Sequence, residues 1–92
     1  MFNESSELEK LREHIDQTDK ELLQALAERM MLVQQIGTYK KGQGLDVRDE
    51  KRRAEVLSSR VALAKKYGLS EELVGKFFEI ILDQAEDQEK QS

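Results

Sequence analysis

The N-terminal part of the chain carries apolar side chains at steps of three, four and seven, the spacing of one face of an α-helix. Ser6 stands three residues before Glu9, which is the arrangement of a capping box at a helix N-terminus. We therefore predict a long helix over about residues 6–41. Its apolar face consists of Leu8, Leu11, Ile15, Leu22, Leu26, Met30, Val33 and Ile36.

Two glycine-containing segments mark where helices should end. Gly42-Gln43-Gly44 follows the long apolar pattern, and Gly68 lies two residues before Ser70. Glycine favours the left-handed conformation that closes a helix, and a serine followed by Glu71 and Glu72 is typical of the start of the next helix. The chain contains no proline that would add a further stop.

The apolar spacing between and after these stops predicts two shorter helices over about residues 49–66 and 70–89, with a loop over residues 42–48. No segment shows the alternation of a β-strand. The sequence therefore predicts an all-α fold of three helices that forms a single domain over residues 1–92.

The predicted first helix is too long for a compact chain of this size. At 1.5 Å per residue, a helix from Ser6 to about Lys41 is roughly 54 Å long, whereas a compact globule of 92 residues is roughly 30 Å across. An apolar stripe left in water is unfavourable by about 25 cal/mol per Å². Pairing with the same stripe of a second copy removes that exposure, so we expect an intertwined homodimer.

Composition excludes several kinds of chemistry. The 92 residues, 38% of them hydrophobic, allow one small core. The absence of cysteine excludes a disulfide framework, a thiolate nucleophile and a zinc site built from cysteines. His14 is the single histidine and has no second histidine with which to share a metal, so we expect no metal site.

Charge and hydropathy narrow the choice of partners. Nineteen acidic and fifteen basic side chains give a net charge of -4, which would repel a nucleic-acid backbone unless the basic residues were segregated. Basic residues are concentrated only in residues 48–53. Residues 1–10 lack the apolar segment of a signal peptide, and no apolar run approaches the roughly 20 residues that span a bilayer. We expect a cytoplasmic protein that binds neither nucleic acid nor membrane.

Three cations of the first helix are candidates for binding an anionic ligand. Arg29 and Lys40 are eleven residues apart, which puts them within about 20° of one helix face and roughly 16 Å apart along the axis. Arg12 lies roughly 25 Å before Arg29, so it reaches the same small ligand only from the partner of an antiparallel dimer. Spacing alone favours the alternative that these are ordinary solvated cations.

A second basic cluster occupies the first turn of the second predicted helix. Lys51, Arg52 and Arg53 lie where the positive end of the helix dipole disfavours cations, and Asp49 and Glu50 offset only part of this. Such a conflict is expected where a site needs positive charge for an anionic ligand, although a surface helix also tolerates it.

Several short motifs occur in a fixed order along almost the whole chain. They are Leu11-Arg12-Glu13-His14-Ile15-Asp16, Leu22-Leu23, Ala27-Glu28-Arg29, Val33 to Lys40, Arg48-Asp49 with Arg52, Gly68-Leu69, Phe78 and Ile81. In this order and spacing the chain resembles the AroQ class of chorismate mutases, three-helix proteins that dimerise through a long first helix.

This resemblance implies conversion of chorismate to prephenate by a pericyclic rearrangement without a cofactor. Such a reaction needs a pocket that holds a dicarboxylate in a reactive fold and stabilises negative charge on the breaking ether oxygen. By resemblance, Arg29 and the partner subunit's Arg12 would clamp the two carboxylates, with Arg52 assisting. Lys40 would donate to the ether oxygen, since one ammonium suits a single oxygen.

The resemblance also implies residues that line the substrate pocket, namely Asp49, Val33 and Ile36. Two positions depart from the family pattern there. Arg53 stands where the family usually has a glutamate that holds the substrate hydroxyl, and Ala85 stands where a serine is often found.

A third departure concerns the ether oxygen. Glu89 stands where a glutamine usually donates to this oxygen, and an ionised carboxylate would repel the developing charge. We therefore hypothesise that Glu89 acts when protonated, so that activity falls as rising pH ionises it. Gln88 is a rival for the same role, because the sequence leaves open which of the two faces the pocket.

Two alternatives to a chorismate mutase remain open at this point. Arg53 is consistent with a sister enzyme on the same scaffold, either an isochorismate pyruvate-lyase or an aminodeoxychorismate mutase. The altered positions 53, 85 and 89 are consistent with a non-catalytic helical dimer that senses a pathway metabolite.

Overall fold

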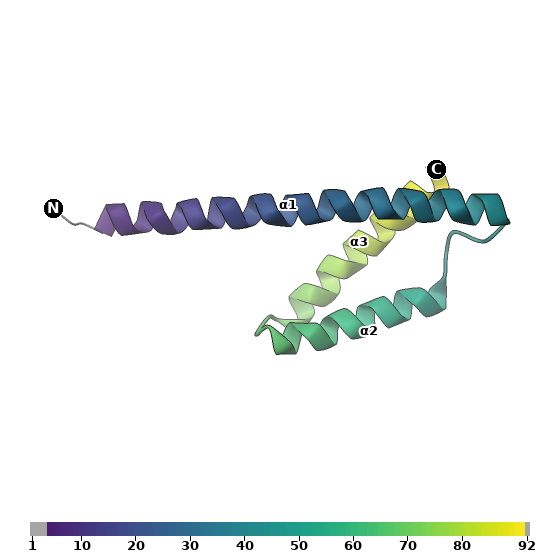
Figure 1. Ribbon diagram of the computed structural model, residues 1–92. Coiled ribbons are helices and arrows are strands. Elements are labelled where there is room, and N and C mark those ends of the chain that lie inside the picture. Colours follow the sequence, from purple (N-terminus) through teal and green to yellow (C-terminus); the bar gives the residue numbers. More distant parts are fainter. Residues whose placement is uncertain (1–3, 92) are drawn as a thin grey trace. The chain divides into compact units, whose positions relative to one another are not determined.

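The computed structural model describes residues 4–91, which form three helices (Figure 1). These are α1 (Glu4–Gln43), α2 (Glu50–Lys66) and α3 (Glu71–Gln91). The described residues contain no β-strand. The prediction of an all-α fold with three helices is therefore confirmed.

Helix α1 begins earlier than its sequence pattern suggested. It starts at Glu4, so Ser6 lies inside the helix and the prediction that Ser6 caps its N-terminus is wrong. The apolar pattern locates a helix well but its first residue poorly, because helix ends are decided by the few backbone groups that lack intrahelical partners.

Helices α1 and α2 end in the same way, with a glycine in the left-handed region. Gly44 and Gly68 both have φ of 69°. In each case the amide of the following residue donates to a carbonyl five residues earlier, which ends the helix in a Schellman motif. The bonds run from Leu45 to Lys40 and from Leu69 to Ala64, each at 2.8 Å.

Side-chain caps start α2 and α3 one residue after the predicted positions. Asp49 Oδ1 accepts from the backbone amide of Arg52 at 3.0 Å, and Ser70 Oγ accepts from the amide of Leu73 at 3.2 Å. Both residues therefore stand just outside their helices and satisfy amides that would otherwise lack partners.

The described chain forms two compact units. The N-terminal unit is the part of α1 up to Leu32, and the C-terminal unit begins at Val33 and contains the end of α1 together with α2 and α3. The prediction of one domain over residues 1–92 stays a prediction. Within residues 4–91, no helix combines the length and the apolar character needed to cross a membrane.

The buried apolar side chains of the described residues all belong to the C-terminal unit. They are Val33 from α1, Val56 and Ala64 from α2, and Ala85 from α3. Helices α2 and α3 pack along each other after the chain reverses in the short turn between them (Figure 1). This pairing places the first turn of α2 near the C-terminal half of α3 and thereby forms the walls of a pocket.

Candidate active site

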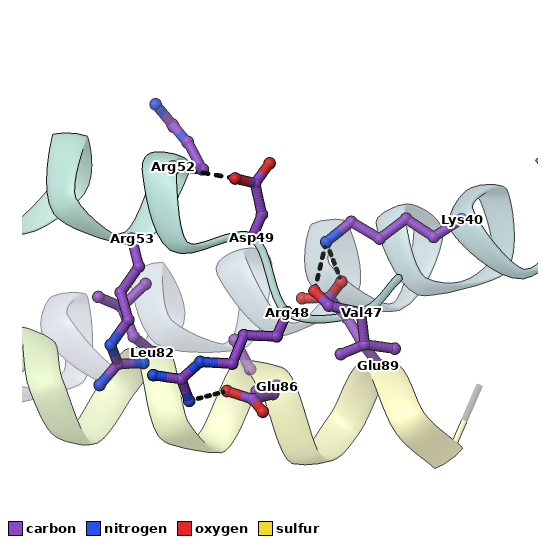
Figure 2. Close-up of a pocket in the computed structure, with 10 residues that line it drawn as sticks. Lys40, Val47, Arg48, Asp49, Arg52, Arg53, Leu82, Glu86 and Glu89 are labelled. Atoms are coloured by element: carbon purple, nitrogen blue, oxygen red, sulfur yellow. Dashed lines mark hydrogen bonds and ion pairs between the residues drawn. The ribbon is translucent and has the colours of Figure 1, made fainter. Parts of the chain in front are cut away.

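An open pocket lies in the C-terminal unit, where the end of α1, the loop after it, the start of α2 and the C-terminal half of α3 meet (Figure 2). Seven of its ten lining residues are charged. The lining residues are Lys40, Val47, Arg48, Asp49, Arg52, Arg53, Leu82, Ala85, Glu86 and Glu89.

Lys40, in the last turns of α1, is held at two points. Its Nζ lies 2.8 Å from Glu89 Oε1 and donates to the Val47 carbonyl at 2.8 Å (Figure 2). Both side chains of the ion pair are mostly buried, so their attraction is screened less than at the surface. An ammonium has three N–H donors. The Val47 carbonyl accepts one of them and Glu89 pairs with the ammonium through charge, so a donor is left for a ligand in the pocket.

Arg48, in the loop before α2, bridges two glutamates. Its Nη1 lies 2.9 Å from Glu86 Oε2 on α3, and its Nε donates to Glu50 at the start of α2. The hydrogen bond from Arg48 lowers the pKa of Glu50, and the attraction of the same guanidinium adds to this effect. Arg48 thus connects the loop to both helices that follow it.

Arg52 and Arg53 point in different directions although they are neighbours in sequence. Arg53 has a side chain only 19% exposed, and its Nη2 lies 2.8 Å from Asp83 Oδ1 on α3. Arg52 is 61% exposed and lies 3.7 Å from Glu55 of its own helix; Figure 2 shows it directed away from Glu86 and Glu89. Successive residues of a helix diverge by 100°, so these two side chains leave α2 in different directions.

Comparison with known proteins identifies the family. A sequence model of the family described as chorismate mutase type II matches residues 11–90. This chain belongs to that family. The match covers α2, most of α1 and nearly all of α3, and so includes every residue that lines the pocket.

Relatives of this chorismate mutase type II chain are longer proteins. It is 39% identical over 67 residues to the T-protein of Haemophilus influenzae, which covers 73% of this chain and 18% of that protein. It is 32% identical over 74 residues to the bifunctional chorismate mutase/prephenate dehydratase of Buchnera aphidicola, covering 80% and 19%. The T-protein of Enterobacter agglomerans is 39% identical over 69 residues, covering 75% and 18%. The chain thus spans about a fifth of the length of these relatives.

The pocket of this family member brings together six of the residues that the sequence marked as candidates, and they come from all three helices and the loop. They are Lys40, Asp49, Arg52, Arg53, Ala85 and Glu89. Among the described residues, Gln88 is half-buried on α3 but does not line the pocket, whereas Glu89 does. Val33 is buried and Ile36 is exposed, and neither lines the pocket.

The two arginines expected to clamp carboxylates lie in the N-terminal unit. Arg12 is exposed and Arg29 is half-buried on α1. Because the pocket is a feature of the C-terminal unit, their roles stay predictions.

Glu86 is the main pocket residue that sequence reasoning missed. It lies three residues after Asp83 and three before Glu89, a spacing that keeps side chains on neighbouring positions of one helix side. Together with the basic residues 48–53, this row of acidic residues could have indicated ion pairs between α3 and the start of α2. The family resemblance pointed instead to the cations and to position 89, where the family usually has a glutamine.

Proposed function

We propose that this chain is a chorismate mutase, which converts chorismate to prephenate by an intramolecular rearrangement. The observation that carries the proposal is the match of residues 11–90 to the chorismate mutase type II family, and an open pocket lined by Lys40, Arg52 and Arg53 supports it. A dicarboxylate substrate is attracted by such cations. A cytoplasmic location, expected from the sequence, stays a prediction.

Lys40 is the proposed electrostatic catalyst. In a pericyclic rearrangement no group of the protein forms a covalent bond, so rate enhancement comes from holding the substrate folded and from stabilising charge on the ether oxygen. The remaining N–H of the Lys40 ammonium is available for that oxygen. Lys40→Met should lower kcat by about 100-fold to 1000-fold, the range for removing one such donor.

Glu89 is proposed to tune this donor. Its carboxylate and an incoming ether oxygen compete for the same ammonium. Replacing Glu89 by glutamine removes this competition, so Glu89→Gln should change kcat for chorismate. An unchanged kcat in the variant would exclude this role for Glu89.

We propose further that the enzyme is a homodimer whose sites combine residues of both chains. Support comes from the N-terminal unit, where five members of the predicted stripe are exposed, each by 45% or more of its surface. They are Leu8, Leu11, Ile15, Leu22 and Met30. A second copy would cover them and would bring the partner subunit's Arg12 to a substrate bound by Arg29.

Subunit mixing tests this shared site directly. Arg12→Ala and Arg29→Ala should each abolish turnover of chorismate while circular dichroism shows unchanged helicity. When the two inactive proteins are mixed and allowed to exchange chains, half of the dimers become mixed and each contains one intact site, so about a quarter of wild-type activity should return. Failure to recover activity after verified exchange would reject a site shared in this way.

Arg53 favours a substrate whose ring carries a different substituent from that of chorismate. Its guanidinium lies in the pocket where the family usually has a glutamate that holds the substrate hydroxyl. Incubation with chorismate, isochorismate and aminodeoxychorismate, followed by product identification, separates the mutase from its sister enzymes. Binding of chorismate by calorimetry without turnover would instead support a non-catalytic sensor.

A further inference from the structure

Three carboxylates of α3 recur every third residue and each pairs with a cation from a different part of the C-terminal unit. The cations belong to α2, to the loop and to the end of α1. The pairs are Arg53 with Asp83, Arg48 with Glu86, and Lys40 with Glu89, at 2.8, 2.9 and 2.8 Å. Helix α3 therefore acts as the common support of the charged pocket.

The pair of Arg48 with Glu86 lies next to both groups that contact the Lys40 ammonium. Arg48 directly follows Val47, the residue whose carbonyl accepts a hydrogen bond from Lys40 Nζ. Glu86, which holds Arg48, lies one helical turn before Glu89, which holds Lys40 from the other side (Figure 2). One anchor thus fixes the peptide that orients the ammonium, and the other contacts the ammonium itself.

We propose that Glu86 is a positioning residue for Lys40. Through Arg48 it fixes the loop of residues 44–49 on α3, so that the Val47 carbonyl and Glu89 together aim the Lys40 ammonium into the pocket. Glu86 acts through Arg48 and need not touch substrate. The effect on turnover rests on the proposed mutase activity, whereas the fixing of the loop does not.

Burial explains why Glu86 rather than Glu50 is the anchor. Both glutamates contact Arg48, but the side chain of Glu86 is 17% exposed and that of Glu50 is 71% exposed. A partly desolvated ion pair is less screened than an exposed one, and exposed pairs contribute little. Glu50 also precedes the rest of α2 in the same local segment as Arg48, so their contact does not tie the loop to α3.

The kinetic effect of removing the Glu86 carboxylate distinguishes positioning of Lys40 from a change in the charge of the pocket. Removing the Glu86 carboxylate makes the pocket more positive, which by itself would improve binding of a dianion and lower KM. Loss of positioning instead weakens an interaction made in the transition state, which lowers kcat and kcat/KM together with little change in KM.

The test uses the full chain and four variants. Glu86→Ala and Glu86→Gln remove the charge, Glu50→Gln is the matched control on the same arginine, and the double variant Arg48→Glu with Glu86→Arg exchanges the pair. In the ligand-free protein, amide hydrogen exchange over residues 45–49 should accelerate about tenfold in Glu86→Ala and return toward wild type in the exchanged pair. Glu50→Gln should leave it unchanged.

Kinetics on chorismate form the second readout. We expect kcat to fall about tenfold in Glu86→Ala, less in Glu86→Gln, with KM changed by less than about twofold. The proposal is overturned if loop exchange and kcat both stay at wild-type values, if Glu50→Gln has an equal effect, or if KM falls while kcat is kept. Should the wild type fail to turn over chorismate, the proposed function fails, and loop exchange still decides whether Glu86 fixes the loop.

Discussion

The two units of this chain differ in how far they bury their own apolar side chains. The C-terminal unit buries apolar side chains from all three helices and pairs most pocket cations with carboxylates of its own α3. The N-terminal unit is a single stretch of helix, and among its described residues no large apolar side chain is buried. The difference indicates that one unit is stabilised within the chain, and it supports our proposal that the other is stabilised by a second copy.

The largest expected effect comes from placing a charge on the apolar stripe of the N-terminal unit. Ile15 is 58% exposed in the single chain. If a second copy covers it, Ile15→Glu should raise the dimer dissociation constant by at least about 100-fold, because an unpaired carboxylate would be buried. Sedimentation equilibrium measures this. Gln17→Glu, on the same helix but outside the stripe, is the control, and equal dissociation of both variants would contradict the comparison.

The C-terminal unit should respond instead to loss of internal packing. Val56 is 2% exposed, so Val56→Ala removes buried methyl groups and should lower the free energy of unfolding by about 2 kcal/mol. Urea unfolding should show this loss at every protein concentration, with little change for Ser58→Ala on the exposed side of α2. A loss that vanishes at high concentration would mean that this unit, too, depends on assembly.

Two glycines of the C-terminal unit should respond with opposite signs. Gly68 has φ of 69°, so Gly68→Ala should destabilise the turn after α2 by about 1 kcal/mol. Gly75 lies within α3, where a Cβ would meet Val61 Cγ2 at an ordinary 3.9 Å, so Gly75→Ala should stabilise by about 0.5–1 kcal/mol. Thermal unfolding of both variants provides the measurement, and shifts of the same sign would be inconsistent with this local geometry.

The smallest expected effect is the pH dependence of the exposed contact between Arg48 and Glu50. The pKa of Glu50 lies below its usual 4.5 in the folded protein, because it accepts a hydrogen bond from Arg48. Its contribution to stability is therefore present above pH 4.5 and is lost as pH falls through the folded pKa. The small difference in unfolding free energy between wild type and Glu50→Gln should shrink on acidification. A difference that grows on acidification would contradict a stabilising contact between Arg48 and Glu50.

Local sequence features determined the helices and most of their ends. The apolar spacing located all three helices, Gly44 and Gly68 stand where two of them stop, and Ser70 caps the start of α3 as predicted. The cap of α2 by Asp49 was not predicted. These predictions succeed because periodicity, left-handed glycine and side-chain caps act within a few residues. The start of α1 was mistaken, since Ser6 has the pattern of a cap but lies inside the helix.

Only the tertiary structure decided how the charged residues share the pocket. The sequence could not tell that Arg53 faces α3 while Arg52 turns outward, that Glu89 rather than Gln88 lines the pocket, or that Glu86 holds Arg48. Each of these depends on the direction from which α3 approaches the start of α2. That direction is set by packing between residues far apart in sequence, whereas periodicity records only which side of each helix is apolar.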